Sequence, residues 1–179
     1  NGGLSVATGG TTTFFSKLRW SLNEDTPIAI FSGSPAFSAG VRVSALNVAS
    51  GAGSFFAGMG NVAAAGTGHT FTNNHIGFKV IKSAGAANLY ATQADGTTEN
   101  VSASLGTTAD GDIWDLIAKE NPTTSVDYYT RKNGGTQSAA TNLTSNLPTA
   151  AASDLSYSSS NVSSAFNFSF TIGASSYER

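Results

Sequence analysis

Cysteine is absent from the 179-residue sequence, which excludes a disulfide framework and a thiolate nucleophile. Charge is also scarce, because 11% of the residues are charged against about 25% in an average soluble domain. The nine Lys and Arg residues are scattered and the formal net charge is −2, so no basic stripe can neutralise phosphates. We therefore expect neither a nucleic-acid partner nor polybasic attachment to a membrane.

Long apolar runs are missing as well. The longest ones, residues 28–31 and 62–65, fall far short of the ~20 residues that span a bilayer as a helix, so we expect no membrane insertion. Small and hydroxyl-bearing residues are abundant instead: Ser, Thr, Asn and Gly make up 80 of the 179 residues. The surface is therefore expected to be neutral and rich in hydroxyl groups.

The chain length fits one large domain, which can bury a core without a disulfide or a structural metal. The beginning of the chain has a different composition, with Gly2-Gly3, Gly9-Gly10 and three consecutive threonines. Such clusters bury little surface. We expect a flexible N-terminal arm over residues 1–12 and a single β-sandwich domain over residues 13–179.

Apolar residues recur with a period of two, the pattern of strands with one buried face. Three segments alternate clearly: residues 75–80, 101–105 and 166–171. Weaker strand candidates are residues 20–22, 28–31, 41–48, 54–58, 89–92, 126–132 and 155–158. Residues 113–120 are the one helix candidate, with Asp112 as its cap and Pro122 as its end.

Two dipeptides mark tight turns between strands. Asp95-Gly96 lies between two strand candidates and Asn133-Gly134 follows residues 126–132, and both accept the positive φ that hairpin turns require. Many short strands and no long helix predict an all-β fold, a two-sheet antiparallel jelly-roll sandwich.

Two segments resemble concanavalin A-like (laminin-G-like) jelly-roll domains, especially those of phage and other virion surface proteins. Residues 76–106 read IGFKVIKSAGAANLYATQADGTTENVSASLG, and residues 125–148 read SVDYYTRKNGGTQSAATNLTSNLP. The resemblance lies in a "GF" strand, an "LYA…DGT" hairpin and an aromatic strand followed by Asn-Gly. It implies the concanavalin A-like sandwich, with residues 166–172 closing a sheet, and a place on a virion surface or outside the cell.

Carboxylates do not form the pattern of a glycosidase. Those enzymes need an acid paired with a nucleophile or base, and the Glu-x-Asp-x-(x)-Glu strand of the sandwich glucanases is absent. Asp110, Asp112 and Asp115 lie close together in the sequence, where they are either acidic residues at a helix start or a candidate calcium site. No Gly-x-Ser-x-Gly motif is present. We expect no enzymatic activity and no obligatory cofactor.

His69 and His75 are six residues apart, but the nitrogen and sulfur ligands that would complete a zinc site are missing nearby. Hydrogen bonding within the fold is the expected role of both histidines.

Aromatic rings are candidates for stacking on sugars, namely Trp20, Trp114, Tyr128, Tyr129 and Tyr157. Neighbouring residues of a strand face opposite sides, so Tyr128 or Tyr129 must point outward. The candidate glycan-binding residues are Asp127, Tyr128, Tyr129, Arg131 and Asn133. Packing at a sheet edge or in a subunit contact is the alternative role of these rings.

Three functions remain open. The first is a non-enzymatic viral structural or surface protein (capsid shell, decoration, spike or fibre domain) that assembles with itself and other virion proteins and attaches to host glycans. The second is a carbohydrate-binding module or glycoside hydrolase of the same fold. The third is a cell-surface filament or pilus subunit, in which residues 4–18 complete the sheet of a neighbour. For the first function we expect a homo-oligomer, because weakly charged sheet edges favour pairing.

Overall fold

The computed structural model describes residues 4–7, 15–21, 36–44, 53–60, 70–83, 85–121, 123–149, 154–161 and 169–178. These residues form thirteen β-strands in two sheets and no helix. One sheet contains β1 (Leu4–Ala7), β3 (Ala36–Ser44), β9 (Ile113–Asn121), β10 (Ser125–Lys132), β11 (Thr141–Leu143) and β13 (Ser169–Glu178). The other contains β2 (Phe15–Ser21), β4 (Gly53–Gly60), β5 (His75–Ser83), β6 (Ala86–Ala94), β7 (Glu99–Val101), β8 (Gly106–Thr108) and β12 (Asp154–Asn161).

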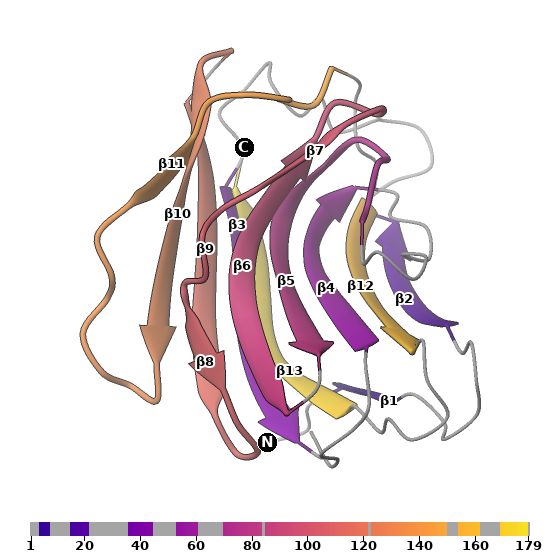
Figure 1. The fold of residues 1–179 in the computed structure, drawn as a ribbon, viewed down its shortest axis with the longest axis vertical. Helices are drawn as coiled ribbons and strands as arrows, with labels where there is room; N and C mark the ends of the chain where they lie inside the picture. The colour runs from indigo at the N-terminus through magenta and orange to yellow at the C-terminus, as the bar shows by residue number, and fades with distance from the viewer. Residues whose placement is uncertain are drawn as a thin grey trace.

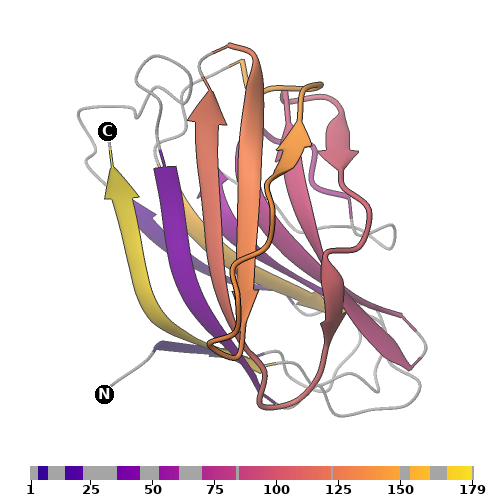
Figure 2. The same ribbon diagram turned by 90° about the vertical axis from the view of Figure 1, so that its left-hand side faces the viewer.

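The two sheets face each other as the layers of a sandwich (Figure 1). The six-stranded sheet has the order β1-β13-β3-β9-β10-β11, and Figure 2 shows its β13, β3, β9, β10 and β11 side by side. The seven-stranded sheet has the order β2-β12-β4-β5-β6-β7, with β8 also paired to β6. Every pair is antiparallel. The all-β sandwich predicted from the sequence is confirmed. No helix long and apolar enough for a bilayer occurs in the described part of the chain.

Alternating side chains from both sheets fill the space between them. Phe55 and Phe78 come from the seven-stranded sheet and Phe37, Leu116 and Tyr128 from the six-stranded one, and all are at most 2% exposed. Together with their aliphatic neighbours they form one continuous cluster. Burial of this apolar surface, at roughly 25 cal/mol per Å², is what holds the two layers together.

The helix predicted over residues 113–120 is wrong, because this segment is β9. Trp114, Leu116 and Ala118 are buried, whereas Ile113 and Lys119 between or beside them are exposed. This is a period of two. β9 also has ladder partners on both sides, β3 and β10, and these pairings outweigh the local helix signal. Asp112 therefore does not cap a helix.

Two of the strongest strand predictions need correction. Residues 75–80 do form part of β5, but His75, Gly77 and Lys79 are buried as well as the apolar residues between them, so the strand is not half-exposed. In the segment 101–105 only Val101 belongs to a strand. Val101 is 36% exposed, so the alternation there does not mark a core face.

Both predicted turns are confirmed. Gly96 has a φ of 96°, and Asn133 and Gly134 have φ values of 51° and 70°. The Asp95 carboxylate accepts hydrogen bonds from the backbone N–H groups of Thr97 and Thr98 at 2.8 Å, which closes the β6–β7 turn. In the second turn the N–H of Gly135 donates to the Lys132 carbonyl at 2.9 Å.

The weaker strand candidates are also borne out in part. Six of them overlap β2, β3, β4, β6, β10 and β12, whereas residues 28–31 lie outside the described residues. Residues 169–171 of the segment 166–171 belong to β13, and residues 166–168 are not described. Leu4–Ala7, within the predicted arm, form β1 and pair with β13 of the same chain. The boundary between arm and sandwich stays a prediction.

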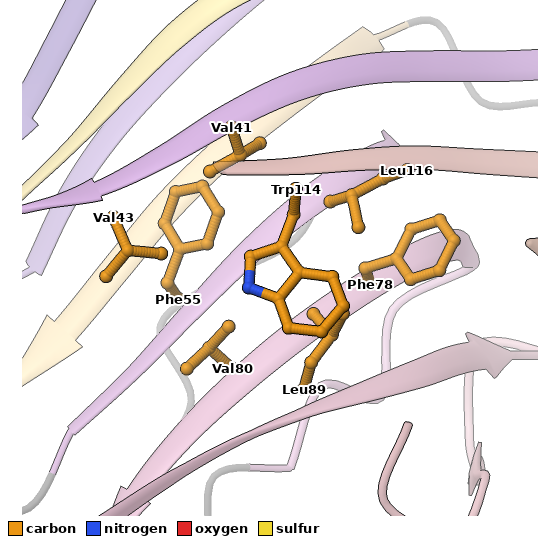
Figure 3. A pocket seen from close by; sticks show the side chains of 8 residues that line it. All are labelled: Val41, Val43, Phe55, Phe78, Val80, Leu89, Trp114 and Leu116. Atoms are coloured by element: carbon orange, nitrogen blue, oxygen red, sulfur yellow. The ribbon is translucent and has the colours of Figure 1, made fainter. Parts of the chain in front are cut away.

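A small gap remains in the core between the sheets. It measures about 10 Å³ and is lined by apolar side chains from β3, β4, β5, β6 and β9 around Trp114 (Figure 3). A space of this size and apolar lining is too small and too dry to bind a ligand. The Trp114 Nε1–H is satisfied, since it donates to the Thr108 hydroxyl at 2.9 Å. Trp114 is 4% exposed, so it is a core residue and not a sugar-stacking ring.

Candidate functional site

Strand β10 separates the predicted glycan-binding residues onto two faces. Val126, Tyr128 and Thr130 are buried, whereas Asp127 and Tyr129 are half-buried and Arg131 is exposed. Because successive strand residues point to opposite sides, Asp127, Tyr129 and Arg131 share the outer face of the six-stranded sheet.

Tyr128 belongs to the core. Its side chain is 1% exposed, and its ring packs edge-on against Phe78 with 5.3 Å between centroids. The hydroxyl donates to the Thr92 carbonyl at 3.0 Å, with Gln93 Oε1 as a second acceptor at 3.2 Å. Burial raises the pKa of Tyr128 well above its usual value. A ligand cannot reach this ring without unfolding of the sandwich.

The register of the sheet gathers the outer residues into what we call the Tyr129 face. Tyr129 lies opposite Ile117, Asp127 opposite Lys119 and Arg131 opposite Asp115 on β9. On the other side of β10, Asn142 lies opposite Asp127. The Tyr129 face comprises Asp115, Ile117, Lys119, Asn121, Asp127, Tyr129, Arg131 and Asn142.

Asp127 is held in place from both sides. The Asn121 amide donates to Asp127 Oδ2 at 2.8 Å, and the Asn142 amide donates to Oδ1 at 2.7 Å. The hydrogen bonds from Asn121 and Asn142 lower the pKa of Asp127. The result is a fixed, ionised carboxylate whose two amide partners keep their oxygens as acceptors.

Arg131 and Asp115 form the opposite border of this face. Arg131 Nε lies 2.6 Å from Asp115 Oδ2, and the two side chains are 51% and 36% exposed. A surface ion pair of this kind adds little to stability, but it orients the guanidinium. Each carboxylate on the face thus has a cation nearby: Asp115 has Arg131, and Lys119 acts electrostatically on Asp127.

Asn133 serves the turn and not the Tyr129 face. Its Oδ1 accepts from the backbone N–H of Ile113 at 2.7 Å, and its amide donates to Asp112 Oδ1 at 2.9 Å. Both ends of the side chain are therefore occupied by the protein itself.

Two aspartates of the candidate calcium site, Asp112 and Asp115, bond to different partners. Asp112 lies 2.7 Å from Lys132 Nζ and accepts from the backbone N–H of Ala109 at 2.7 Å, while Asp115 pairs with Arg131. Asp110 belongs to the turn before β9. Within the described residues no group of three or more His, Asp or Glu side chains is arranged to hold a metal ion.

Sequence reasoning missed a polar cluster on the other sheet. His75 and Lys79 of β5, Thr92 of β6 and Glu99 of β7 are joined by hydrogen bonds of 2.6 to 3.0 Å. They lie on the outer side of the sheet, yet their side chains are at most 3% exposed. Phe71, which is 2% exposed, packs beside the cluster.

Burial controls the charge state of this cluster. It lowers the pKa of His75 to about 4 and also lowers the pKa of Lys79. His75 bonds to the Asn73 carbonyl and Thr92, which agrees with a hydrogen-bonding role; its sequence neighbour His69 lies outside the described residues. The alternation of His75 and Lys79 was visible in the sequence, but Glu99 and Phe71 join them only through the fold.

No protein-family model matches the sequence, and a search of curated proteins gives no match. Among solved structures, the chain is similar to a legume lectin-like domain from Entamoeba histolytica, with a TM-score of 0.54, 10% identity, and coverage of 96% of this chain and 82% of that one. It is also similar to an endo-β-1,4-glucuronan lyase from the fungus Trichoderma reesei (TM-score 0.54, 8% identity, 96% and 81% covered). A third similar structure is the alginate lyase Aly36B (TM-score 0.53, 11% identity, 99% and 81% covered).

At these identities the likeness concerns the fold. It confirms the fold that the resemblance implied, because the chain has the two-sheet antiparallel arrangement of a concanavalin A-like jelly-roll sandwich.

Proposed function

We propose that the protein is a non-enzymatic surface protein that binds a neutral glycan through the Tyr129 face. The observation that carries this proposal is the position of Tyr129, half-exposed between the fixed Asp127 carboxylate and the Arg131–Asp115 pair. A sugar ring has an apolar C–H side and hydroxyl groups around its rim. The face offers an aromatic ring for the first and planar acceptors and donors for the second.

The charges favour a ligand without charge of its own. Asp115 and Asp127 each have a cation close by, so neither sign dominates the Tyr129 face. The Asp115 carboxylate offsets the charge of the Arg131 guanidinium, which weakens the attraction of the face for an acidic polysaccharide. A neutral saccharide hydrogen-bonds to the same groups as they stand.

Glycoside hydrolysis does not fit the face. Asp127 lies opposite Lys119 and Asp115 opposite Arg131, so four residues, or about 13 Å of strand, separate the backbone positions of the two aspartates. The paired carboxylates of glycosidases are about 5 to 9.5 Å apart. The cluster of titratable groups around His75 is buried and out of reach of a polymer.

The comparisons support saccharide as the ligand class through the names of the similar structures, a lectin-like domain and two polysaccharide lyases. We place the protein on a virion surface because of the resemblance of residues 76–106 and 125–148 to phage and virion domains, and we propose that it acts there as a homo-oligomer. Light scattering of the purified protein measures the oligomeric state, and a strictly monomeric protein would contradict that part.

A glycan array followed by calorimetry tests the glycan-binding proposal. We expect binding to neutral oligosaccharides, a roughly tenfold or greater loss in Tyr129→Ala and Asp127→Ala, and no loss in Tyr90→Ala, a half-buried tyrosine of the seven-stranded sheet. Binding should hardly change with salt.

Two results would contradict the proposal. One is a preference for uronate or sulfated polymers with steep salt dependence. The other is formation of unsaturated or hydrolysed sugar products by the wild-type protein.

A further inference from the structure

The Tyr129 face has different hydrogen-bonding groups on the two sides of its aromatic ring. Asp127 and Arg131 lie on the same face of β10 as Tyr129, each two residues, or about 7 Å of strand, away from it. Tyr129 offers a ring above β10, whereas its neighbour on β9 is the aliphatic Ile117. A pyranose stacked on Tyr129 therefore has one edge toward Asp127 and the opposite edge toward Arg131.

Asp127 presents acceptors to such a sugar. Asn142 donates to Asp127 Oδ1 at 2.7 Å, and Asn121 donates to Oδ2 at 2.8 Å. A carboxylate oxygen accepts two hydrogen bonds, so each oxygen keeps one position for a ligand. The hydrogen bonds from Asn121 and Asn142 also lower the pKa of Asp127, so the group is ionised at neutral pH and has no proton to donate. Two neighbouring hydroxyl groups of one sugar can therefore donate to Asp127 together.

Lys119 makes this edge more selective for hydroxyl groups. It lies opposite Asp127 on β9 and acts on it electrostatically. An ammonium group only donates and a carboxylate only accepts, so a ligand group that contacts both must accept from one and donate to the other. A hydroxyl group does both. An ether oxygen or a methylated hydroxyl cannot donate, and it would leave the carboxylate without the hydrogen bond that water gave it.

Arg131 presents donors to the opposite edge. Its Nε–H donates to Asp115 Oδ2 at 2.6 Å, which orients the guanidinium, and its side chain is 51% exposed. A guanidinium has N–H groups on three nitrogens and no acceptor. The N–H groups on the two Nη atoms therefore suit an oxygen that carries no proton.

A pyranose has the same polarity across its ring. The ring oxygen has no proton, and the ring atom opposite to it is C3, which carries a hydroxyl group in common hexoses. A second hydroxyl group, on C2 or C4, is next to it. In the reverse orientation the ring oxygen would lie against the Asp127 carboxylate, where two acceptors repel each other and no proton lies between them.

Building on the proposed glycan binding, we infer that the Tyr129 face selects a pyranose with a free 3-hydroxyl group and a free hydroxyl group next to it. Both hydroxyl groups donate to Asp127, and the ring oxygen accepts from Arg131. A sugar unit that is linked or methylated at its 3-oxygen is excluded from the face.

Nuclear magnetic resonance titrations of the labelled protein test this selection, with the backbone amide signals of β10 as the readout. The probes are the methyl pyranosides of glucose, galactose and mannose. The one that binds most tightly is then compared with its own 3-deoxy and 6-deoxy derivatives, in the wild type and in Asp127→Asn. This variant keeps the shape of the side chain and replaces one acceptor oxygen with a donor.

We expect Asp127→Asn to weaken binding of the parent sugar about tenfold or more, because hydrogen bonds to a charged group are lost. The 6-deoxy sugar should show the same factor, since its 3-hydroxyl group is intact. For the 3-deoxy sugar the factor should fall to about threefold or less, because the hydroxyl group that Asp127 contacts is already missing.

Equal factors for the parent and the 3-deoxy sugar would overturn the selection of the 3-hydroxyl group and leave glycan binding itself standing. Binding of array glycans without binding of any methyl pyranoside would also overturn it, because a single ring would then not be the unit recognised. Absence of binding to every glycan would instead overturn the proposed function.

A carba-sugar, in which a methylene group replaces the ring oxygen, tests the orientation at Arg131. It should bind more weakly than the parent sugar to the wild type, and the two should bind equally to Arg131→Gln. Undiminished affinity of the carba-sugar for the wild type would overturn the orientation.

Discussion

Tyr128 and Tyr129 lie on opposite faces of β10, and their substitution tests whether the first serves stability and the second serves glycan binding. Tyr128→Phe removes only the buried hydroxyl that donates to the Thr92 carbonyl at 3.0 Å. The ring and its edge-on contact with Phe78 remain. Tyr129→Phe removes a hydroxyl from the half-exposed side chain on the outer face.

The expected loss of stability in each variant depends on which hydrogen-bond acceptors the missing hydroxyl leaves without a donor. In Tyr128→Phe the Gln93 Oε1 and the Thr92 carbonyl lose a donor in a fully buried environment, and such a loss costs about 1 to 3 kcal/mol. At about 2 kcal/mol the unfolding equilibrium constant rises roughly 30-fold, and the Tm of a chain of this size falls by about 4 to 8 °C. Tyr129→Phe should stay within about 0.5 kcal/mol of wild type.

Urea denaturation followed by fluorescence and circular dichroism measures the stability, and calorimetry measures glycan binding. Tyr128→Phe should bind like wild type below its transition, and Tyr129→Ala should bind at least tenfold more weakly at nearly unchanged stability. The reasoning is refuted if Tyr128→Phe is as stable as wild type, or if it loses glycan binding while it remains folded.

Three further predictions concern a buried glycine, the metal and pH. Gly77→Ala should destabilise the protein by about 2 to 3 kcal/mol in urea denaturation, since its Cβ would collide with the backbone oxygen of Ala57; a variant as stable as wild type would contradict this contact. Calcium at 1 mM should leave the Tm unchanged in calorimetry, because Lys132 already neutralises Asp112, and a rise in Tm would reinstate the calcium site. Glycan binding should stay constant from neutral pH down to the ordinary Asp pKa of 3.8. Because the pKa of Asp127 is lowered, its negative charge, and with it the binding, should be lost only at a pH below 3.8. Loss of binding near pH 6 would show that another group titrates.

Alternation identified most of the described strands, but it did not distinguish strand from helix in every segment. Residues 113–120 contain Ile113, Trp114, Leu116 and Ile117, a spacing that fits a helical stripe as well as a strand. The choice is made by β3 and β10, which pair with both edges of the segment. Such long-range pairing is not visible in a window of eight residues.

The Tyr129 face was predictable only as far as one strand extends. The order Asp127, Tyr129, Arg131 follows from alternation along β10. Asn142 and Asp115 reach the face because β11 and β9 pair with β10 in one register, and a shift by one residue would turn both away. Asn133 comes after Arg131 in the same alternation, but it is absent from the face because its side chain bonds to Ile113 and Asp112 at the turn.

Exposure was the property that the sequence could least predict. A strand with His75, Gly77 and Lys79 on one side has the pattern of a solvated face, yet that side is buried. Polar side chains can be buried there because they satisfy one another: His75 bonds to Thr92, and Lys79 bonds to Glu99. Hydrophobic patterning does not detect such pairing, because it assigns every polar residue to the solvent-exposed face. A polar position in a strand therefore predicts solvent only when no complementary group comes within hydrogen-bonding distance of it, and that condition is set by the register of β5, β6 and β7.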